Sequence, residues 1–286
     1  MSEQSQAPYG QNTSAPAGTS LPSRVRIPHL ARAKAEGRHF AMLTAYDCQI
    51  ASIFDEAGIE VLLVGDSAAS TMMGASSTLP ITMEEMIVFA RSVVAGTKRA
   101  LVVCDMPFGS YEVSVEQAVA NGIRLLKEAG VHAVKLEGGA RYAPHVEAMT
   151  AAGVPVMGHI GFTPQSEHVL GGYRIQGRGE AAQVMIDDAL ALQDAGSFCV
   201  LMEMVPTEAA RAVDAALRVP TIGIGAGPVT TGQVLVWQDM LGLGSGRNPR
   251  FVKKYAELRP LITSAAAAYL HDVHAGTFPG PEHGFE

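Results

Sequence analysis

Cysteine is scarce in this sequence, whose 286 residues include only Cys48, Cys104 and Cys199. The three lie far apart and form no CxxC pair, so neither a zinc knuckle nor a redox dithiol is indicated. A small, odd number of cysteines is typical of proteins in a reducing compartment. We therefore expect a cytoplasmic protein that does not depend on disulfides.

Positive charge and long apolar runs are also lacking. The chain has 21 Lys and Arg against 28 Asp and Glu, which gives a formal net charge of -7. Binding to a nucleic-acid backbone rests on clustered Lys and Arg, so a nucleic-acid partner is not expected. No apolar run approaches the roughly 20 residues that cross a bilayer, so we expect no membrane partner. A small anionic substrate stays compatible with this charge, because one local cation can override a diffuse acidic surface.

The first 23 residues have neither the basic start nor the apolar stretch of a signal peptide. They are rich in Ser, Gln, Pro, Gly and Ala, a composition typical of disorder. We therefore predict a disordered leader over residues 1–23 and one catalytic domain over residues 24–286. With 48% hydrophobic residues, a domain of this size can bury a large core without covalent staples.

From Phe40 onward, short apolar strands alternate with amphipathic helices. The predicted strands are Phe40–Tyr46, Val61–Ser67, Ala100–Pro107, Ala133–Gly138, Pro155–Gly161, Cys199–Val205, Thr221–Gly227 and Val234–Met240. Predicted helices include Thr82–Gly96, Ser114–Ala129, Glu180–Ala195 and Thr207–Ala216. Strands that are apolar almost throughout and separated by helices indicate a parallel sheet buried on both faces.

Two architectures fit this pattern, a closed barrel and an open doubly wound sheet. Eight strand–helix units favour the α/β class with a single (β/α)8 TIM barrel. An open sheet usually carries a Gly-rich phosphate loop after its first strand, whereas here that strand ends in TAYDC. The long segment 162–179 interrupts the rhythm and is predicted to be a lid or a binding loop.

Acidic side chains recur where consecutive predicted strands end. Asp66 is followed by Ser67 after one apolar run, Asp105 ends the next run, and Glu137 ends a third, two residues after Lys135. In a parallel barrel these ends meet at one mouth, where catalytic residues gather. Ionised carboxylates there are costly without compensation, and one lysine cannot balance them. Oxygen ligands suit Mg2+ or Mn2+, so Asp66, Asp105 and Glu137 are predicted to hold one divalent cation.

Two further strand-end residues are candidates. Glu203 lies between two methionines, neither of which can satisfy a carboxylate, so a functional role is favoured. His159 fits either a catalytic role or a hydrogen-bonded core histidine. A lone Asp at a strand end is more often a helix cap or turn residue, and such a role is the alternative for Asp66 with Ser67 and for Asp105. The recurrence of acids on three consecutive strands, with a lysine beside one of them, argues against it. The glycines of GIGAG at 223–227 suit either a phosphate cradle or tight strand-end turns.

At these residues the chain resembles the ketopantoate hydroxymethyltransferase family. The matching stretches are TAYD at 44–47, VGDS at 64–67, STLP at 77–80, VKLEGG at 134–139, GHIGFTPQS at 158–166, GGYRIQGRG at 171–179, GIGAG at 223–227 and PGPEHGF at 279–285. Together they span the chain from Phe40 to its end in family-like order and spacing.

The resemblance implies a barrel of the phosphoenolpyruvate/pyruvate superfamily. It also implies a Mg2+-dependent transfer from 5,10-methylenetetrahydrofolate to 3-methyl-2-oxobutanoate, which yields 2-dehydropantoate and tetrahydrofolate in the first committed step of pantothenate biosynthesis. By the same resemblance, Asp66, Asp105 and Glu137 ligate the metal, Asp66, Ser67, Asp105 and Lys135 bind the substrate, and Glu203 is the proton acceptor. A homo-oligomer, most often a decamer, is implied as well.

These residues suggest a mechanism, which we state as a hypothesis. The 2-oxo acid chelates the metal, which acidifies its C3–H, and Glu203 removes that proton. Lys135 stabilises the metal-held enolate, and His159 assists or orients a neighbour. The rivals are a metal-free aldolase with Lys135 as a Schiff base, a metal-dependent lyase or mutase that needs no folate, and a scaffold that binds a small acid without turnover.

Overall fold

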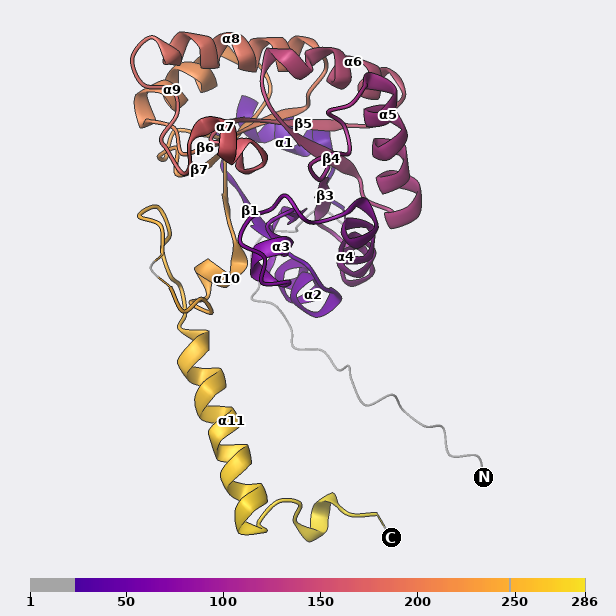
Figure 1. The fold of residues 1–286 in the computed structure, drawn as a ribbon, viewed down its shortest axis with the longest axis vertical. Helices are drawn as coiled ribbons and strands as arrows, with labels where there is room; N and C mark the ends of the chain where they lie inside the picture. The colour runs from indigo at the N-terminus through magenta and orange to yellow at the C-terminus, as the bar shows by residue number, and fades with distance from the viewer. Residues whose placement is uncertain (1–23, 247, 286) are drawn as a thin grey trace.

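The computed structural model describes residues 24–246 and 248–285, and its eight strands form one closed barrel of parallel strands (Figure 1). Each strand pairs with its neighbours in chain order, and the last closes on the first through Met42↔Val234. This closure confirms the predicted (β/α)8 barrel and excludes the open sheet. The strands are β1 Phe40–Thr44, β2 Val61–Val64, β3 Leu101–Asp105, β4 Ala133–Glu137, β5 Val156–Gly161, β6 Cys199–Glu203, β7 Thr221–Ile224 and β8 Gly232–Leu235.

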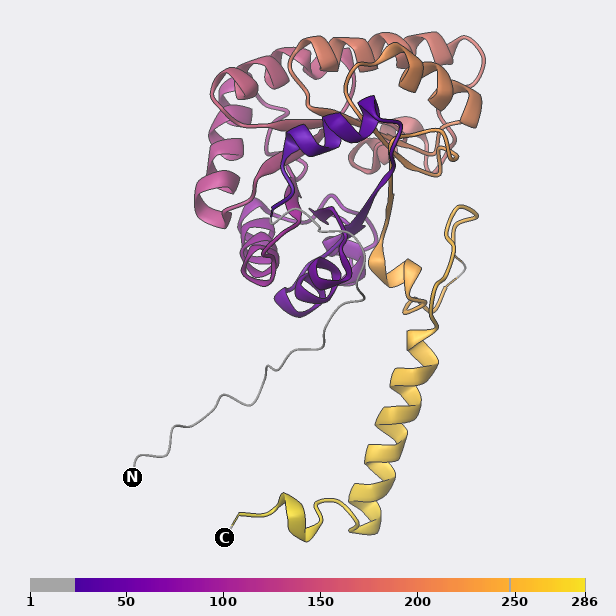
Figure 2. The ribbon, with the colours of Figure 1, turned by 180° about the vertical axis from the view of Figure 1, so that it is seen from behind.

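Helices surround the barrel, as Figures 1 and 2 show from opposite sides. The α-helices are α1 Ile27–Ala35, α2 Cys48–Ala57, α3 Ala68–Thr71, α4 Met83–Gly96, α5 Val115–Arg124, α6 Ala143–Ala151, α7 Glu167–Leu170, α8 Ala181–Asp194, α9 Thr207–Ala216, α10 Trp237–Met240 and α11 Leu258–Ala275. A π-helix, η1 Leu125–Ala129, continues α5, and the 3-10 turns are η2 Ala140–Tyr142, η3 Pro164–Ser166 and η4 Pro281–His283. The predicted helices are present to within a residue at each end, with Ser114–Ala129 divided between α5 and η1.

The barrel interior and its outer layer are separate apolar cores. Inward-facing residues of the strands pack in the lumen together with Leu30 and Ala33 of α1 and with Val25, which precedes that helix. The backbone N–H of Val25 donates to the carbonyl of Arg99, which precedes β3, so α1 closes the N-terminal end of the barrel. The lumen is therefore packed below and open for a site only at the C-terminal ends of the strands.

One sequence expectation needs correction. The predicted strand Val234–Met240 is wrong in its second half, because β8 ends at Leu235 and α10 begins at Trp237. The Trp237 N–H donates to Thr44 Oγ1 over 3.1 Å, which turns the chain out of the sheet. The segment 162–179, predicted to be a lid or a binding loop, contains the short helices η3 and α7. The predicted leader 1–23 lies outside the described residues, and the division into domains stays a prediction.

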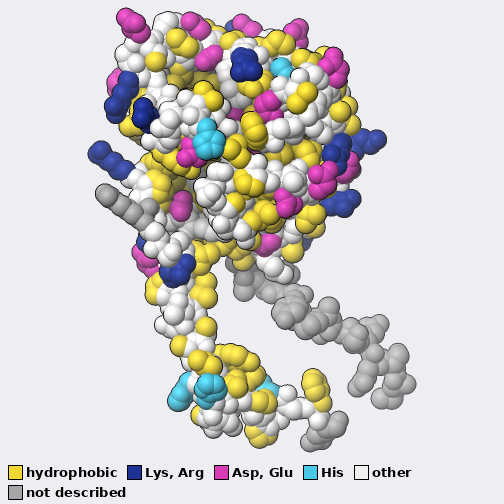
Figure 3. Space-filling view, in the orientation of Figure 1, with side chains coloured by type: hydrophobic (Ala, Val, Ile, Leu, Met, Phe, Trp, Pro, Cys, Tyr) yellow, Lys and Arg dark blue, Asp and Glu magenta, His cyan; other side chains and the backbone are white. Residues whose placement is uncertain are grey.

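Helix α11 does not cover its own barrel. It projects away from the strands in both views and has no buried residue (Figures 1 and 2). Apolar side chains along it are exposed, among them Leu261 at 64% and Tyr269 at 60%, and Figure 3 shows hydrophobic atoms along this projection. On the barrel, the outward side chain of Gln233 on β8 is exposed as well. None of the described helices is long and apolar enough to span a membrane.

Candidate active site

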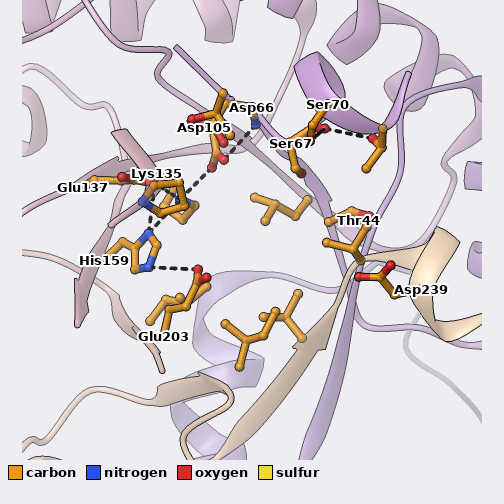
Figure 4. A pocket seen from close by; sticks show the side chains of 18 of the residues that line it. Thr44, Asp66, Ser67, Ser70, Asp105, Lys135, Glu137, His159, Glu203 and Asp239 are labelled. Carbon is orange, nitrogen blue, oxygen red and sulfur yellow. Dashed lines mark hydrogen bonds and ion pairs between the residues drawn. The ribbon is translucent and has the colours of Figure 1, made fainter. Parts of the chain in front are cut away.

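A cavity of about 330 Å3 opens at the C-terminal ends of the strands (Figure 4). All seven side chains named from the sequence line it: Asp66, Ser67, Asp105, Lys135, Glu137, His159 and Glu203. They come from the ends of β2 to β6 and the turns that follow, which is where a parallel barrel places its chemistry. Five of these side chains are buried, with at most 4% of each residue exposed: Asp66, Asp105, Lys135, Glu137 and His159.

Lys135 is at the centre of the charged groups. Its Nζ lies 3.1 Å from Asp105 Oδ1, 3.7 Å from Glu137 Oε1 and 3.2 Å from His159 Nδ1. The strand register causes this, because Asp105 pairs with Lys135 across β3 and β4 while Glu137 pairs with His159 across β4 and β5. Burial alone would lower the pKa of Lys135, but Asp105, Glu137 and Asp66 together raise it above its usual value. Lys135 is therefore a fixed cation.

The carboxylates differ in how well they are compensated. Burial raises the pKa of Asp66 well above its usual range, and repulsion from Asp105 and Glu137 raises it further. Burial also raises the pKa of Asp105, although Lys135 opposes that change. Burial acts in the same direction on Glu137, but the His159 contact at 3.3 Å, the Lys135 ammonium and the Gln165 N–H outweigh it and lower its pKa. The cluster is thus short of positive charge mainly at Asp66 and Asp105.

His159 connects this cluster to Glu203. Its Nε2 lies 3.6 Å from Glu203 Oε2, while its Nδ1 faces Lys135 (Figure 4). Burial and Lys135 lower the pKa of His159, so the ring is neutral. Nδ1 also lies 3.3 Å from Glu137 Oε1, so it faces both a cation and a carboxylate, while Nε2 makes no hydrogen bond within the described residues.

Glu203 is set apart from the other acids at the end of β6. Burial, followed by repulsion from Glu137, raises its pKa to about 8. The backbone around it is constrained, because a Cβ on Gly161, which has φ +92°, would overlap the Glu203 carbonyl oxygen. The next residue, Met204, adopts φ 49°, a conformation that costs a non-glycine residue about 1–3 kcal/mol. Such strain, held in place by the fold, is typical of functional sites.

Gln165 is a site residue that the sequence prediction missed. Its Nε2 donates to Asp66 Oδ2 over 2.8 Å and to the Met106 carbonyl over 3.0 Å, and its N–H donates to Glu137 Oε2 over 3.0 Å. Its Oε1 accepts a 2.6 Å hydrogen bond from Tyr111, whose hydroxyl also contacts the backbone of Glu137. Gln165 lies in η3, inside the segment that was predicted only as a lid or a binding loop, and Tyr111 had no signal in the sequence.

Two other features border the cavity. Ser67 Oγ and the Tyr46 hydroxyl share a 2.8 Å hydrogen bond, which fixes Ser67 at the mouth. From segment 162–179, Pro164 and Tyr173 contribute to the cavity wall, and the Tyr173 ring lies 4.7 Å from that of Phe162. The three cysteines are free thiols and none lines the cavity.

The described residues do not contain a preformed cage in which three His, Cys, Asp or Glu side chains converge on an ion. Lys135 and Gln165 lie between the three acids and hold them by direct contacts. The donor set nevertheless fits a hard cation, because it is made of carboxylate oxygens with an excess of negative charge. Asp105 Oδ1 accepts no hydrogen bond and has only the Lys135 ammonium near it, so it is free to ligate.

Comparison with known proteins identifies the relatives of this chain. The family model described as ketopantoate hydroxymethyltransferase matches residues 24–281. A protein of Paenarthrobacter aurescens (strain TC1) named 3-methyl-2-oxobutanoate hydroxymethyltransferase is 63% identical over 285 residues, which cover 98% of this chain and 95% of that protein. A protein of the same name from Mycobacterium marinum (strain ATCC BAA-535 / M) is 55% identical, covering 100% of this chain and 99% of that protein.

Solved structures share the fold at low sequence identity. A 2,3-dimethylmalate lyase of the PEP mutase/isocitrate lyase superfamily is 16% identical with a TM-score of 0.58, covering 91% of each chain. A phosphonopyruvate hydrolase in complex with oxalate and Mg++ is 13% identical with a TM-score of 0.57, covering 90% of this chain and 92% of that one. With its barrel, its strand-end carboxylates and relatives that match over almost its full length, this chain is an enzyme that belongs to the ketopantoate hydroxymethyltransferase family.

Proposed function

We propose that this enzyme transfers a one-carbon unit from 5,10-methylenetetrahydrofolate to C3 of 3-methyl-2-oxobutanoate, with water as the third reactant, to give 2-dehydropantoate and tetrahydrofolate. This is the first committed step of pantothenate biosynthesis. The observation that carries the proposal is the separation of Glu203 from the other acids. Glu203 has a pKa raised to about 8 and no cation in contact with it, whereas Asp105 and Glu137 flank Lys135.

Asp66, Asp105 and Glu137 would hold one Mg2+ or Mn2+ ion. When bound, the cation would neutralise these carboxylates and polarise the carbonyl of the 2-oxo acid. Asp66, Ser67, Asp105 and Lys135 would contact the acid, with Lys135 as the fixed positive charge beside its anionic oxygens. Gln165 would keep Asp66 and Glu137 in place by the hydrogen bonds described above.

Glu203 would take the C3 proton. Its raised pKa makes it a stronger base than an ordinary carboxylate once it is ionised. The C–H electrons then form the enolate, which Lys135 stabilises. C3 bonds to the methylene carbon of the donor as one of its two C–N bonds opens. Water then replaces the second nitrogen on that carbon, which leaves the hydroxymethyl group on the product and releases tetrahydrofolate. His159 would lie beside this carboxylate, with its Nε2 3.6 Å from Glu203 Oε2, and could exchange a proton with it as the base turns over. Segment 162–179 would exclude water from the enolate through Tyr173.

Deuterium exchange at C3 tests this assignment without the folate. Wild-type enzyme with Mg2+ should exchange the C3 hydrogen of 3-methyl-2-oxobutanoate, and EDTA should stop the exchange until metal is restored. Glu203→Gln should abolish exchange while the 2-oxo acid still binds. The exposed Glu208→Gln on α9 serves as the matched control. Retained exchange in Glu203→Gln would remove Glu203 from the base role.

The same measurements separate the rivals. Trapping of substrate on Lys135 by borohydride would support a Schiff base, a mechanism that the raised pKa of Lys135 opposes. Turnover of the 2-oxo acid without any folate would support a lyase or mutase. Binding of metal and acid with no exchange and no turnover would leave only a scaffold.

We also propose a homo-oligomer, a decamer by the family resemblance. The exposed apolar side chains of α11 support this, because a projecting helix with Leu261 and Tyr269 in water is stabilised by packing on another copy. The cytoplasmic location expected from the sparse cysteines stays a prediction.

A further inference from the structure

The cavity extends beyond the carboxylate cluster to a second set of lining residues. Lys135, Glu137 and His159 lie on one side of it in Figure 4, and Asp239 lies on the other, beside Thr44. Val236, Pro249 and Phe251 line the cavity too. We call Val236, Asp239, Pro249 and Phe251 the distal wall. None of the roles given above uses this wall.

Asp239 is held in position by its backbone while its carboxylate stays free. The Trp237 N–H donates to Thr44 Oγ1 over 3.1 Å, and the Asp239 N–H donates to the Val236 carbonyl over 3.1 Å. Within residues 24–246 and 248–285, the Asp239 carboxylate has no hydrogen bond or ion pair. Burial raises its pKa, with no cation to oppose the change. A carboxylate in this setting gains free energy from a ligand that brings N–H donors.

Phe251 gives the distal wall an aromatic surface. Its ring packs over Gly225 of the GIGAG stretch, where a Cβ would lie 2.8 Å from the ring. Gly225 also has φ +64°, so glycine serves here for both the turn and the close approach of the ring. A Cβ on Gly227 would overlap Thr207 Oγ1, so tight packing accounts for this glycine as well. A planar ring entering the cavity beside Phe251 would find Val236 and Pro249 as apolar neighbours.

The geometry points to the distal wall as the subsite for the pterin ring of the one-carbon donor, with Asp239 accepting from the pyrimidine edge and Phe251 contacting the ring face. This inference rests on the proposed function. The pyrimidine edge of a reduced pterin carries a ring N–H beside an exocyclic amine, a pair of donors that matches the two oxygens of a carboxylate. With the pterin ring bound at the distal wall and the 2-oxo acid bound at Lys135, the two substrates would face each other across the cavity.

Asp239→Asn tests the subsite, because an amide keeps the size of the side chain but offers one acceptor and an unwanted donor. We expect the KM for methylenetetrahydrofolate to rise about 10- to 100-fold, the usual effect of losing hydrogen bonds to a charged group. The folate-independent C3 exchange and the KM for the 2-oxo acid should change far less. Asp187→Asn on α8, an exposed Asp that only accepts from Gln183, is the matched control. An equal rise in the KM values for methylenetetrahydrofolate and for the 2-oxo acid would overturn the assignment.

A folate that lacks one hydrogen-bond donor allows the same test by binding measurements, without kinetics. Tetrahydrofolate without the 2-amino group should bind wild-type enzyme more weakly than tetrahydrofolate, and Asp239→Asn should bind the two alike. An unchanged preference in Asp239→Asn would place the pterin elsewhere. If wild-type enzyme exchanges C3 but needs no folate for turnover, the proposed function fails and the subsite with it. If turnover needs folate but Asp239→Asn leaves its KM unaltered, only the subsite fails.

Discussion

Glu203 and Lys135 both line one cavity, yet their pKa values are raised for different reasons. Lys135 has Asp105 and Glu137 within 3.7 Å, so attraction outweighs burial and the ammonium persists. Glu203 has only a neutral imidazole near it, so burial dominates and favours its protonated form. At the scale of residues, strand register thus determines which group is a permanent charge and which can exchange a proton.

The raised pKa of Glu203 predicts a pH-dependent stability of the metal-free protein. With a folded pKa of about 8 against an ordinary 4.5, the folded state keeps a proton that the unfolded state loses between these values. Stability therefore falls as pH rises through this window. Glu203→Gln in EDTA should match wild type near pH 5 and unfold about 3–10 °C higher near pH 9. Thermal scans of both, with Glu208→Gln as control, measure this, and a pH-independent difference would contradict it.

Gln165 should control metal affinity, because it orients two of the proposed ligands. Gln165→Leu removes its side-chain hydrogen bonds to Asp66 and Tyr111 and is expected to weaken Mn2+ binding about 10- to 100-fold. Tyr111→Phe should show part of this loss. Calorimetric titration with Mn2+ measures it directly, and Gln183→Leu on the exposed face of α8 is the control. Wild-type affinity in Gln165→Leu would remove Gln165 from this role.

Single site residues were predictable from the sequence where a polar side chain ended an apolar strand and the strands belonged to a parallel fold. The acids Asp66, Asp105 and Glu137 follow apolar strands in a parallel fold, which alone implies that they meet. Gln165 carries no such signal, since an amide in a loop is ordinary. Its importance arises from the fold of η3, which brings it over β2 and β4. Asp239 was hidden for a related reason, because its stretch was predicted to be strand and is helix α10.

At the scale of elements, the end of β5 positions β6. Gly161 pairs with Glu203 across the two strands, and its lack of a side chain lets the Glu203 carbonyl approach. The eight strands were predictable because each is a short apolar run between helices. The end of β8 was not, because VWQDM continues an apolar pattern while the hydrogen bond from Trp237 to Thr44 bends the backbone. That bond joins residues distant in sequence.

Gly161→Ala should therefore damage the site more than a comparable change elsewhere. Both Gly161 and Gly153 have positive φ, of +92° and +87°, but a Cβ on Gly153 would meet nothing within 4 Å. Each alanine should cost about 1–3 kcal/mol for its backbone conformation. Only Gly161→Ala should also displace Glu203 and lower the C3 exchange rate at least about 100-fold. Equal exchange rates in the two variants would contradict this.

At the scale of the whole molecule, α11 is the element that the barrel does not explain. Its sequence is helical and moderately apolar, and nothing in it reveals that it leaves its own barrel. The structure shows this directly, with every residue of the helix outside the core (Figure 1). Helix α10 ends at Met240 and α11 begins at Leu258, so a long connection carries the chain from the barrel to the projecting helix.

Assembly should depend on the apolar side chains of α11. Leu270→Glu places a charge on a residue that exposes 54% of its surface, and it should reduce the molar mass in solution by breaking contacts between copies. Light scattering after gel filtration would measure this against the 30.0 kDa subunit. Val113→Glu, at a residue 80% exposed on the barrel, should leave the mass unchanged. A wild-type protein of one subunit mass would overturn the proposed oligomer.

The connection between α10 and α11 has a consequence for how the enzyme responds to dilution. The Leu258 N–H donates to the Leu241 carbonyl and the Tyr255 N–H to the Met240 carbonyl, so α11 is rooted on the short helix that carries Asp239. Phe251 lies in the same connection. If copies assemble through α11 as proposed, mass action would act on catalysis. At subunit concentrations low enough to free α11, the distal wall would loosen first, while the carboxylates of β2 to β4 would keep their register.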